Sequence, residues 1–445
     1  MSGTKSDIPS DASYLSDTAV QTPTPDNAVE KPVSPPGGDV AQFGPAPDGG
    51  FRAWSVAAGG FFVTFAALGF ANSFGVFQEY YITHQLSNKS ADDIAWIGSS
   101  NAFCQFLAGS IAGPLFDRYG ARLILPSAIV CIFAIMMVSL CNEYYQFLLA
   151  QGILLGTSVG FMQFPAMAAV GQFFDKKRAA ALGLTVAGSS VGGVIFPIAT
   201  SRMLNDPSVS SHLTFGWSVR ILGFIMLFSL AIAVVTIRPR LPSRTTQFFM
   251  FAAFRKFDYQ FIVISMFFLF IGLFTPIFFL PSYAVSRGME PTLASYLLAI
   301  VNAASTFGRI IPGILADKFG RINVLAIGGL STGITILCMT CAKSTPGLVV
   351  YAIVFGFMSG TIVSGAMAAM SACVDDARDL GTYMGMGLGA ASVAVLIGPP
   401  ISGALLHRSG AFLHSTIFSG VMSIVGGFLA VVAKKGTKAG IFGRS

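Results

Sequence analysis

The side chain with the clearest chemical potential is Arg309, the one charge well inside an apolar run, in the stretch VNAASTFGRIIPG. An unpaired cation is costly in hydrocarbon, so such a residue usually faces a water-filled cavity. There its planar guanidinium could donate two parallel hydrogen bonds to a carboxylate. Two alternatives stay open: the side chain could extend toward the membrane surface, or it could pair with Asp317, about two helical turns away.

Uncharged polar residues in other apolar runs could line the same cavity, and large apolar residues could form its wall. With Arg309, the predicted substrate-binding residues are Asn72, Asn302, Ser305 and Met367, with Thr306, Phe74 and Phe278 as further lining. A hydrogen bond between helices, or simple packing, would account for each uncharged residue equally well.

The sequence does not predict an enzyme, because His, Asp, Glu and Cys do not cluster in a way that would build a catalytic centre at a membrane face. We therefore expect no catalytic residue, no metal and no cofactor. A Walker A loop is missing, so ATP hydrolysis is not the expected energy source. Cys338 and Cys341 form a C-x-x-C motif without a nearby histidine, which favours two packed helix cysteines over a zinc or redox site.

The elements that must position these residues are membrane helices. With 53% apolar residues, 11% charged residues and a mean hydropathy of +0.70, the chain has too little polar surface for a water-soluble globule. Its apolar runs are continuous and about twenty residues long, whereas a transmembrane barrel would alternate apolar and polar residues. The net charge of +7 sits mostly in short loops, so we expect a lipid bilayer and not a nucleic acid as partner.

Twelve apolar runs predict an all-α integral membrane protein with two pseudo-symmetric six-helix halves. The runs fall at roughly 53–77, 94–115, 122–141, 144–168, 179–201, 218–237, 259–281, 292–315, 322–341, 346–371, 380–405 and 413–433. The expected division is a disordered cytoplasmic tail at 1–50, a first half at 51–238, a cytoplasmic central loop at 239–258, a second half at 259–434 and a short cytoplasmic tail at 435–445.

Loop charges predict the orientation, because lysine and arginine resist translocation across the membrane. With both termini cytoplasmic, only six basic residues lie in the outer loops: Lys89, Arg202, Arg220, Arg287, Lys343 and Arg408. The sequon Asn88-Lys89-Ser90 then lies outside, where Asn88 could carry a glycan, although a chance match accounts for it equally well.

A loop motif occurs once in each half: GPLFDRYGARLIL (113–125) returns as GILADKFGRINVL (313–325). The repeat predicts two halves in parallel orientation. Membrane topology alone would need the positive charges, but not the repeated aspartate and glycines. We therefore predict a gating function for Asp117, Arg118, Asp317 and Lys318. Arg178, in the next inner loop, is predicted to join them, although topology would also place a positive residue there.

This loop pattern resembles the signature of the major facilitator superfamily, which implies two halves that rock about a central site. Three further stretches resemble its monocarboxylate porter family, particularly the fungal members: PDGGFRAW (47–54), FFDKKRAAALGLTVAGSSVG (173–192), and YAIVFGFMSG (351–360) with LIGPPISG (396–403). The resemblance implies that Arg309 grips a substrate carboxylate and that the aspartates and basic residues of the loop motif hold the halves together on the inner side. It also implies a plasma-membrane location.

The chain departs from that family at two positions. Porters of lactate type carry a lysine in helix 1 and an aspartate before the helix 8 arginine, where this chain has Asn72 and Ser305. Moreover, none of the 20 Asp and Glu residues and none of the four histidines falls deep in a predicted helix. Proton coupling stays possible, but no intramembrane carboxylate supports it.

The expected function is secondary transport of a small organic solute, a monocarboxylate or a related organic acid, by alternating access. The alternative is export of a secondary metabolite or other larger organic molecule, which would suit the loss of the lysine and the carboxylate. A more remote alternative is a transporter-like sensor, but the tail of about fifty residues contains no recognisable signalling domain.

Overall fold

The computed structural model describes residues 44–211, 213–242 and 249–437, and every regular element in these ranges is a helix. The expected amino-terminal tail up to residue 43, most of the carboxyl tail and part of the central loop lie outside the described residues. The described residues form one compact unit.

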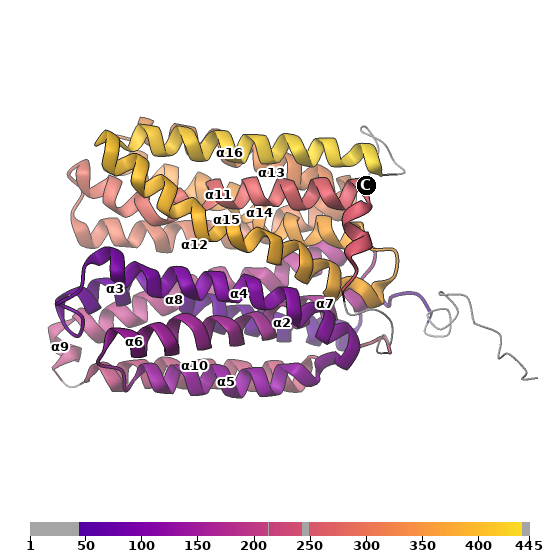
Figure 1. The fold of residues 1–445 in the computed structure, drawn as a ribbon, viewed down its shortest axis with the longest axis horizontal. Coiled ribbons are helices and arrows are strands. Elements are labelled where there is room, and N and C mark those ends of the chain that lie inside the picture. Colours follow the sequence, from indigo (N-terminus) through magenta and orange to yellow (C-terminus); the bar gives the residue numbers. More distant parts are fainter. Residues whose placement is uncertain (1–43, 212, 243–248, 438–445) are drawn as a thin grey trace, which may run out of the picture. The chain divides into compact units, whose positions relative to one another are not determined.

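The first half contains the helices drawn from indigo to pink in Figure 1. They are α2 (Phe51–Ala71), α3 (Phe74–Thr83), α4 (Ala91–Tyr119), η1 (Gly120–Leu123), α5 (Ile124–Val138), α6 (Tyr144–Phe147), the π-helix η2 (Leu148–Leu155), α7 (Gly156–Phe173), α8 (Arg178–Asn205), α9 (Pro207–Ser210) and α10 (Phe215–Thr236).

The second half follows after the central loop, in salmon to yellow. Its helices are η3 (Phe251–Arg255), α11 (Phe257–Ser286), α12 (Pro291–Phe319), α13 (Arg321–Leu337), η4 (Cys338–Cys341), α14 (Thr345–Ala372), η5 (Ala377–Asp379), α15 (Leu380–Ser409), α16 (Phe412–Ala433) and η6 (Lys434–Gly436). The expected domain boundaries stay predictions, but α10 ends and α11 begins close to them.

The described part contains eleven continuous helical spans long and apolar enough to cross a membrane, and one of them makes two crossings. This span, Asp93–Val138, has 46 residues and includes both α4 and α5. The chain turns between them at Gly120, whose φ of +67° favours glycine. Since α4 packs on α15 whereas α5 packs on α10 and α7, the two helices are separate crossings. The predicted all-α fold with twelve membrane helices is confirmed.

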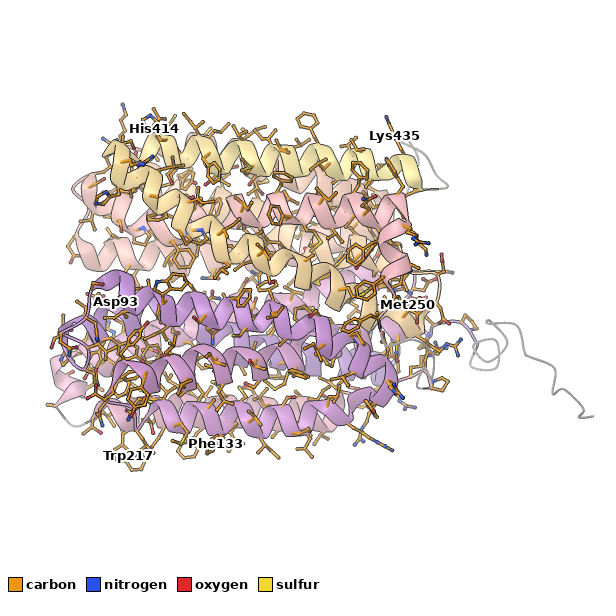
Figure 2. All side chains as sticks on the ribbon, viewed as in Figure 1. Asp93, Phe133, Trp217, Met250, His414 and Lys435 are labelled. Carbon is orange, nitrogen blue, oxygen red and sulfur yellow. The ribbon has the colours of Figure 1, made fainter. Side chains whose placement is uncertain are left out.

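Large apolar side chains on the flanks fit a lipid environment. Phe133 and Trp217 point away from the bundle in Figure 2, and 55% and 53% of their surfaces are exposed. Exposed apolar surface of this extent would be a liability in water, but it is favourable against lipid.

The two halves meet where α4 crosses α15 and where α8 crosses α12. Glycines allow the backbones to approach closely at both crossings. A Cβ atom on Gly113 would lie 2.0 Å from the Gly381 carbonyl oxygen, and one on Gly183 would lie 2.5 Å from the Arg309 carbonyl oxygen. A side chain at either position therefore cannot fit without moving the two halves apart.

We predict that Gly113→Val destabilises this packing by about 1–3 kcal/mol, because overpacking forces neighbouring backbone to shift. The check is the thermal unfolding of the purified protein in detergent. Gly75→Ala is the matched control, since an added Cβ there meets nothing within 4 Å. An unchanged melting temperature for Gly113→Val would contradict the close crossing.

Candidate functional site

Asp117, at the end of α4, binds the first turn of α15 in the other half. Its Oδ1 accepts a hydrogen bond from the Gly381 N–H at 3.0 Å, and its Oδ2 accepts from the N–H and hydroxyl of Thr382, both at 2.6 Å. The first N–H groups of a helix have no partner within it and carry a partial positive charge. A buried carboxylate is therefore a strong ligand for this helix end.

Asp317, at the end of α12, makes the corresponding contact in the opposite direction. Its two oxygens accept from the Ala179 and Ala180 N–H groups of α8 at 3.0 and 2.9 Å. It also forms an ion pair with Arg321 at 3.5 Å, and not with Arg309. We call these two contacts the Asp117 latch and the Asp317 latch, and the end of the bundle where they lie the latch end.

The predicted basic gating residues differ in their surroundings. Arg178 is buried, and it donates to the Ser371 carbonyl of the other half at 3.2 Å and to the Phe174 carbonyl at 2.8 Å. Arg118 and Lys318 are exposed and, among the described residues, form no hydrogen bond or ion pair with the other half. The contacts between halves are thus made by the aspartates and Arg178, while a gating role for Arg118 and Lys318 stays a prediction.

Two basic residues of the latch end, both outside the membrane spans, have shifted pKa values. Burial lowers the pKa of Lys256, but hydrogen bonds to Asp375 and Tyr383 outweigh it, so this pKa lies above its usual value. Burial lowers the pKa of Arg240.

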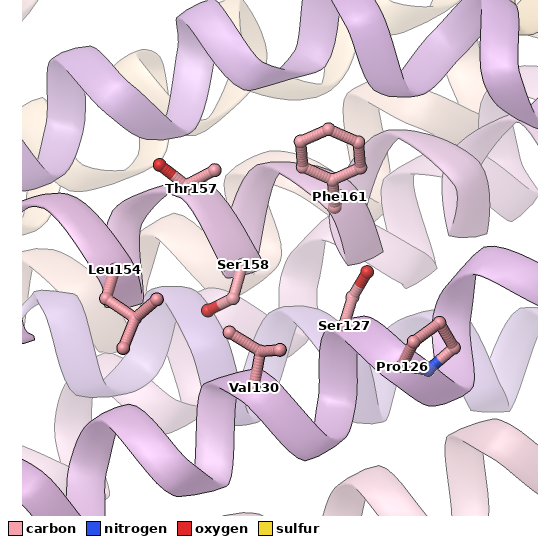
Figure 3. A pocket seen from close by; sticks show the side chains of 7 residues that line it. All are labelled: Pro126, Ser127, Val130, Leu154, Thr157, Ser158 and Phe161. Carbon is pink, nitrogen blue, oxygen red and sulfur yellow. The ribbon is translucent and has the colours of Figure 1, made fainter.

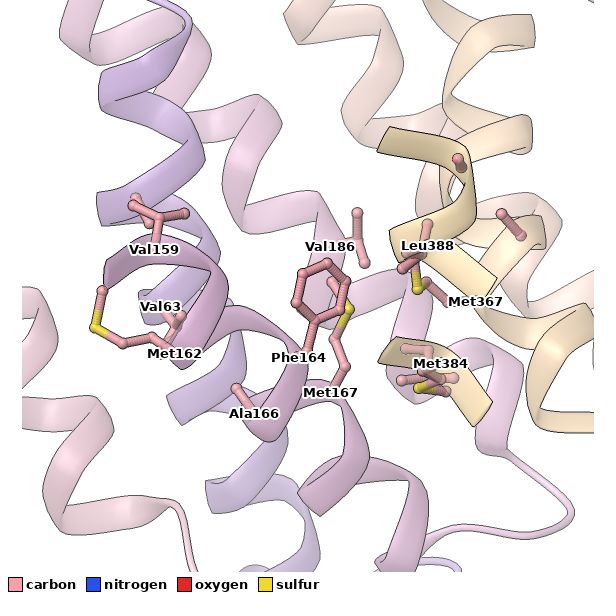
Figure 4. Close-up of a cluster of buried hydrophobic side chains, with 14 of the residues drawn as sticks. Val63, Val159, Met162, Phe164, Ala166, Met167, Val186, Met367, Met384 and Leu388 are labelled. Carbon is pink, nitrogen blue, oxygen red and sulfur yellow. The ribbon is translucent and has the colours of Figure 1, made fainter. Parts of the chain in front are cut away.

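A layer of apolar side chains lies next to the latches, toward the membrane centre. Figure 4 shows side chains from both halves gathered there, and all of them belong to one buried cluster: Phe164 and Met167 of α7, Val186 of α8, Met367 of α14, and Met384 and Leu388 of α15. Those of α7, α14 and α15 lie four to nine residues from the latch ends of their helices, or about 6–14 Å. Met367 is therefore part of this apolar layer.

Arg309 lies at the depth of the inner part of this layer, eight positions or about 12 Å along α12 from Asp317. It is 8% exposed, and its Nη1 donates to the Val186 carbonyl at 2.8 Å and to the Ser189 hydroxyl of α8. In the part of the chain that the structure describes, no acceptor pairs with its Nε and no carboxylate forms an ion pair with it. A buried guanidinium with an unused donor can bind an anion.

Two asparagines complete this group. Asn72 is exposed at the break between α2 and α3, and its Nδ2 donates to the Ser189 carbonyl at 3.3 Å. A Cβ on Gly193 would lie 2.7 Å from Asn72 Nδ2 and 2.8 Å from Asn302 Oδ1, so both amides reach the same point of α8. We call Asn72, Ser189, Asn302 and Arg309 the polar cluster; its residues come from both halves.

Ser305 lies elsewhere. Although one helical turn from Arg309, it is buried against α14, where a Cβ on Gly360 would lie 2.9 Å from its hydroxyl. Substrate binding by Ser305 and Met367 stays a prediction, and neither residue joins the polar cluster. Ser189 was not predicted as a site residue from the sequence. Its position could have indicated this, because it lies four residues before Gly193, on the face of α8 that other helices approach closely.

The groove shown in Figure 3 is a separate feature. It has a volume of about 220 Å³, lies between α5 and the fourth membrane helix, and is lined by Pro126, Ser127, Val130, Leu154, Thr157, Ser158 and Phe161. None of these residues belongs to the polar cluster. We also find no group of His, Cys, Asp and Glu suited to a metal ion within the described ranges.

Comparisons with known proteins agree with this architecture. The family model for the Major Facilitator Superfamily matches residues 59–311 and 262–441. The aspyridones efflux protein apdF of Emericella nidulans is 49% identical over 405 residues, or 91% of this chain and 82% of the relative. The agnestins efflux protein AgnL12 of Paecilomyces divaricatus is 41% identical over 395 residues, which cover 88% of this chain and 89% of the relative.

Two solved structures share the fold. The human organic anion transporter MFSD10 has a TM-score of 0.67 at 14% identity, with 85% of this chain and 99% of that chain covered. The transporter FucP in its outward conformation has a TM-score of 0.66 at 16% identity, with 85% and 98% covered. The two curated relatives are named as efflux proteins, so they support the superfamily but not specifically the monocarboxylate porters.

We predict that Ser189→Ala destabilises the protein by about 1–3 kcal/mol, because it removes an acceptor from the buried Arg309 guanidinium. Thermal unfolding in detergent is the measurement. The neighbouring Ser190→Ala is the control, since the Ser190 hydroxyl is buried without a hydrogen bond among the described residues. Equal melting temperatures for the two variants would show that Ser189 does not stabilise the arginine.

Proposed function

The chain belongs to the major facilitator superfamily, and from that premise we propose that it exports an organic metabolite by alternating access of the polar cluster. It is a multi-pass membrane protein, and its family and relatives are transporters and not enzymes. The observation that carries the proposal is that both latches lie at one end of the molecule, with an apolar layer next to them and the buried Arg309 at the inner part of that layer.

Export is favoured over the expected uptake or release of a monocarboxylate. The relatives apdF and AgnL12 are named for efflux of aspyridones and agnestins. The polar cluster also contains asparagines and a serine, and no lysine or carboxylate accompanies Arg309 among the described residues. The leading expectation from the sequence therefore gives way to its alternative, export of a larger organic molecule.

In the proposed cycle the latches close one end of the transport path. Hydrogen bonds to a charged group contribute about 1.5–3 kcal/mol each, so five N–H and O–H donors on two aspartates can hold the halves together firmly. Opening breaks both latches, separates the apolar layer and admits substrate to the polar cluster. Rocking of the halves then exposes the cluster at the opposite end.

Arg309 gives the proposed substrate its chemical class. A buried cation with a free donor selects an acidic or enolate-type oxygen, and the amides of Asn72 and Asn302 can bind further oxygens. Methionines in the adjoining layer adapt to irregular apolar shapes. We therefore propose an anionic metabolite with a sizeable apolar part. The cluster offers no titratable acid or histidine among the described residues, so no proton step is assigned to it.

The proposed orientation places the latch end in the cytoplasm of the producing cell, in agreement with the loop charges. Asn88 then lies outside, in the exposed turn before α4, where Ser90 and Asp93 form a capping box. The plasma membrane is the proposed location.

We predict that Arg309→Ala abolishes export and that Arg309→Lys retains at most about one tenth of it, because a lysine keeps the charge but loses the planar pair of donors. Comparing the metabolites inside and outside the cells of a deletion strain identifies the substrate. The flux of that substrate is then measured in proteoliposomes with and without a pH gradient. Arg408→Ala, an exposed change at the opposite end, is the control for expression and insertion. Full export by Arg309→Ala would refute the assigned role.

We predict that Asn88 carries an N-glycan when the protein is made in a eukaryotic host. Wild-type protein should then lose mass on endoglycosidase treatment, and Asn88→Gln should migrate like the treated protein. The control is a sequon introduced at the latch end by Lys435→Asn, which with Gly436 and Thr437 reads Asn-Gly-Thr and should stay unmodified. Modification at the latch end but not at Asn88 would reverse the proposed orientation.

A further inference from the structure

The segment before the first membrane helix lies against the loop that joins α7 to α8. We call residues 44–50 the strap and residues 174–177 the α7–α8 loop. The Asp48 N–H donates to the Phe173 carbonyl at 3.2 Å, and the Asp48 Oδ1 accepts from the N–H groups of Asp175 and Lys177 at 2.6 and 3.2 Å. One aspartate of the strap therefore binds the backbone of the loop twice and the last residue of α7 once.

The strap is held in a shape that costs energy for most residues. Asp48 has a φ of +50° and is the only described non-glycine residue with positive φ, while Gly50, just before α2, has a φ of +84°. Aspartate is among the residues that tolerate this region best. The turn directs the Asp48 carboxylate toward the loop while the chain enters α2.

The other end of the strap is bound by Arg240, which follows α10. Its Nη2 donates to the Gly44 and Pro45 carbonyls, both at 2.7 Å. The Arg240 N–H also donates to Gln172 Oε1 at 3.0 Å, directly before the α7–α8 loop. Ring contact between Trp54 and Phe174, with centroids 5.0 Å apart, adds an apolar link. The loop is thus enclosed by segments from both ends of the first half.

The α7–α8 loop leads directly into the Asp317 latch. Asp48 binds the N–H groups of Asp175 and Lys177, and Asp317 of the other half binds those of Ala179 and Ala180. The two carboxylates therefore hold neighbouring donors on one short stretch of backbone. Because the direction of an N–H group follows from the backbone conformation before it, the loop determines how well Asp317 is bound.

The segment that leads into the Asp117 latch is the turn before α15. The turn before α15 is organised locally, since Asp376 accepts from the Arg378 N–H at 2.9 Å and pairs with its guanidinium at 2.8 Å. The segment before α11 contacts that turn through Lys256 and Asp375, an ion pair in which the aspartate is 89% exposed. Exposed pairs of this kind contribute little.

We propose that Asp48 is a positioning residue for the gate: it holds the α7–α8 loop in the conformation that presents the Ala179 and Ala180 N–H groups to Asp317. This assignment rests on the proposed function, in which the latch closes one end of the transport path. In the contacts above, the strap touches neither the polar cluster nor the other half. The assignment nevertheless makes the strap one of the segments that determine how often the latch end opens.

The test measures opening directly, without transport. Ala368 is 1% exposed in a buried cluster that joins the two halves beside the Asp317 latch, so a cysteine there reacts with a maleimide only when the latch end opens. Ala368→Cys is made in a version whose six native cysteines are replaced by alanine. We expect Asp48→Ala to raise the labelling rate about threefold to tenfold, because two bonds to a charged acceptor are lost at a partly exposed site.

Asp48→Asn is the conservative variant and should label like wild type, because asparagine also tolerates positive φ and its Oδ1 can accept the same two hydrogen bonds. Asp317→Ala should also raise labelling, and Asp48→Ala should add little to it, since a residue that acts through the latch has no effect once the latch is gone. Arg202→Ala, which removes an exposed ion pair at the opposite end, is the matched negative control.

Three outcomes would overturn parts of this assignment, and they are distinguishable. Equal labelling of Asp48→Ala and wild type, with faster labelling of Asp317→Ala, rejects the role of Asp48 alone. Additive effects in the double variant show that Asp48 acts independently of Asp317, which also rejects it. If Asp317→Ala itself leaves labelling unchanged, the latch does not control opening and the proposed function fails.

Discussion

The structure depends on one interaction used twice: a carboxylate from one half binds the free N–H groups at the start of a helix in the other half. Asp117 binds α15 and Asp317 binds α8, so each half holds the other by its least satisfied backbone groups. These hydrogen bonds are strong while water is excluded from the helix ends, and water can replace them when the halves separate. A contact of this kind can be both firm and reversible, as a gate requires.

The rest of the arrangement follows from closing one end in this way. Glycines at the two crossings let the helix ends come close enough for the aspartates to reach, and the apolar layer excludes water behind them. Arg309 can then stay buried with backbone and hydroxyl acceptors and no counter-ion from the described part of the chain. An anionic substrate would supply the missing charge, which links binding to the conformational state of the site.

Much of this could be predicted from the sequence, because hydropathy, repeats and intramembrane charge are local signals. Those signals predict the twelve helices, the paired aspartates and Arg309. The latch partners could not be predicted, since every residue except proline has a backbone N–H group and the sequence does not indicate which of these groups an aspartate will bind. Arg118 and Lys318 share the repeat but face outward, and Ser305 faces α14 because α12 packs between two helices. The substrate could not be predicted from the sequence, because the motifs that resemble monocarboxylate porters mainly describe the scaffold and the loops, and not the lining of the cavity.

The central claim is that the two latches set the balance between two orientations of the halves. Distances between paired spin labels test it most directly, with one pair at Arg122 and Lys435 on the latch end and another at Trp217 and His414 on the opposite end, all of them exposed. Replacing Asp117 and Asp317 together by alanine should lengthen the first distance and shorten the second. If both distances keep their wild-type values, the halves do not rock about these latches and the claim is wrong.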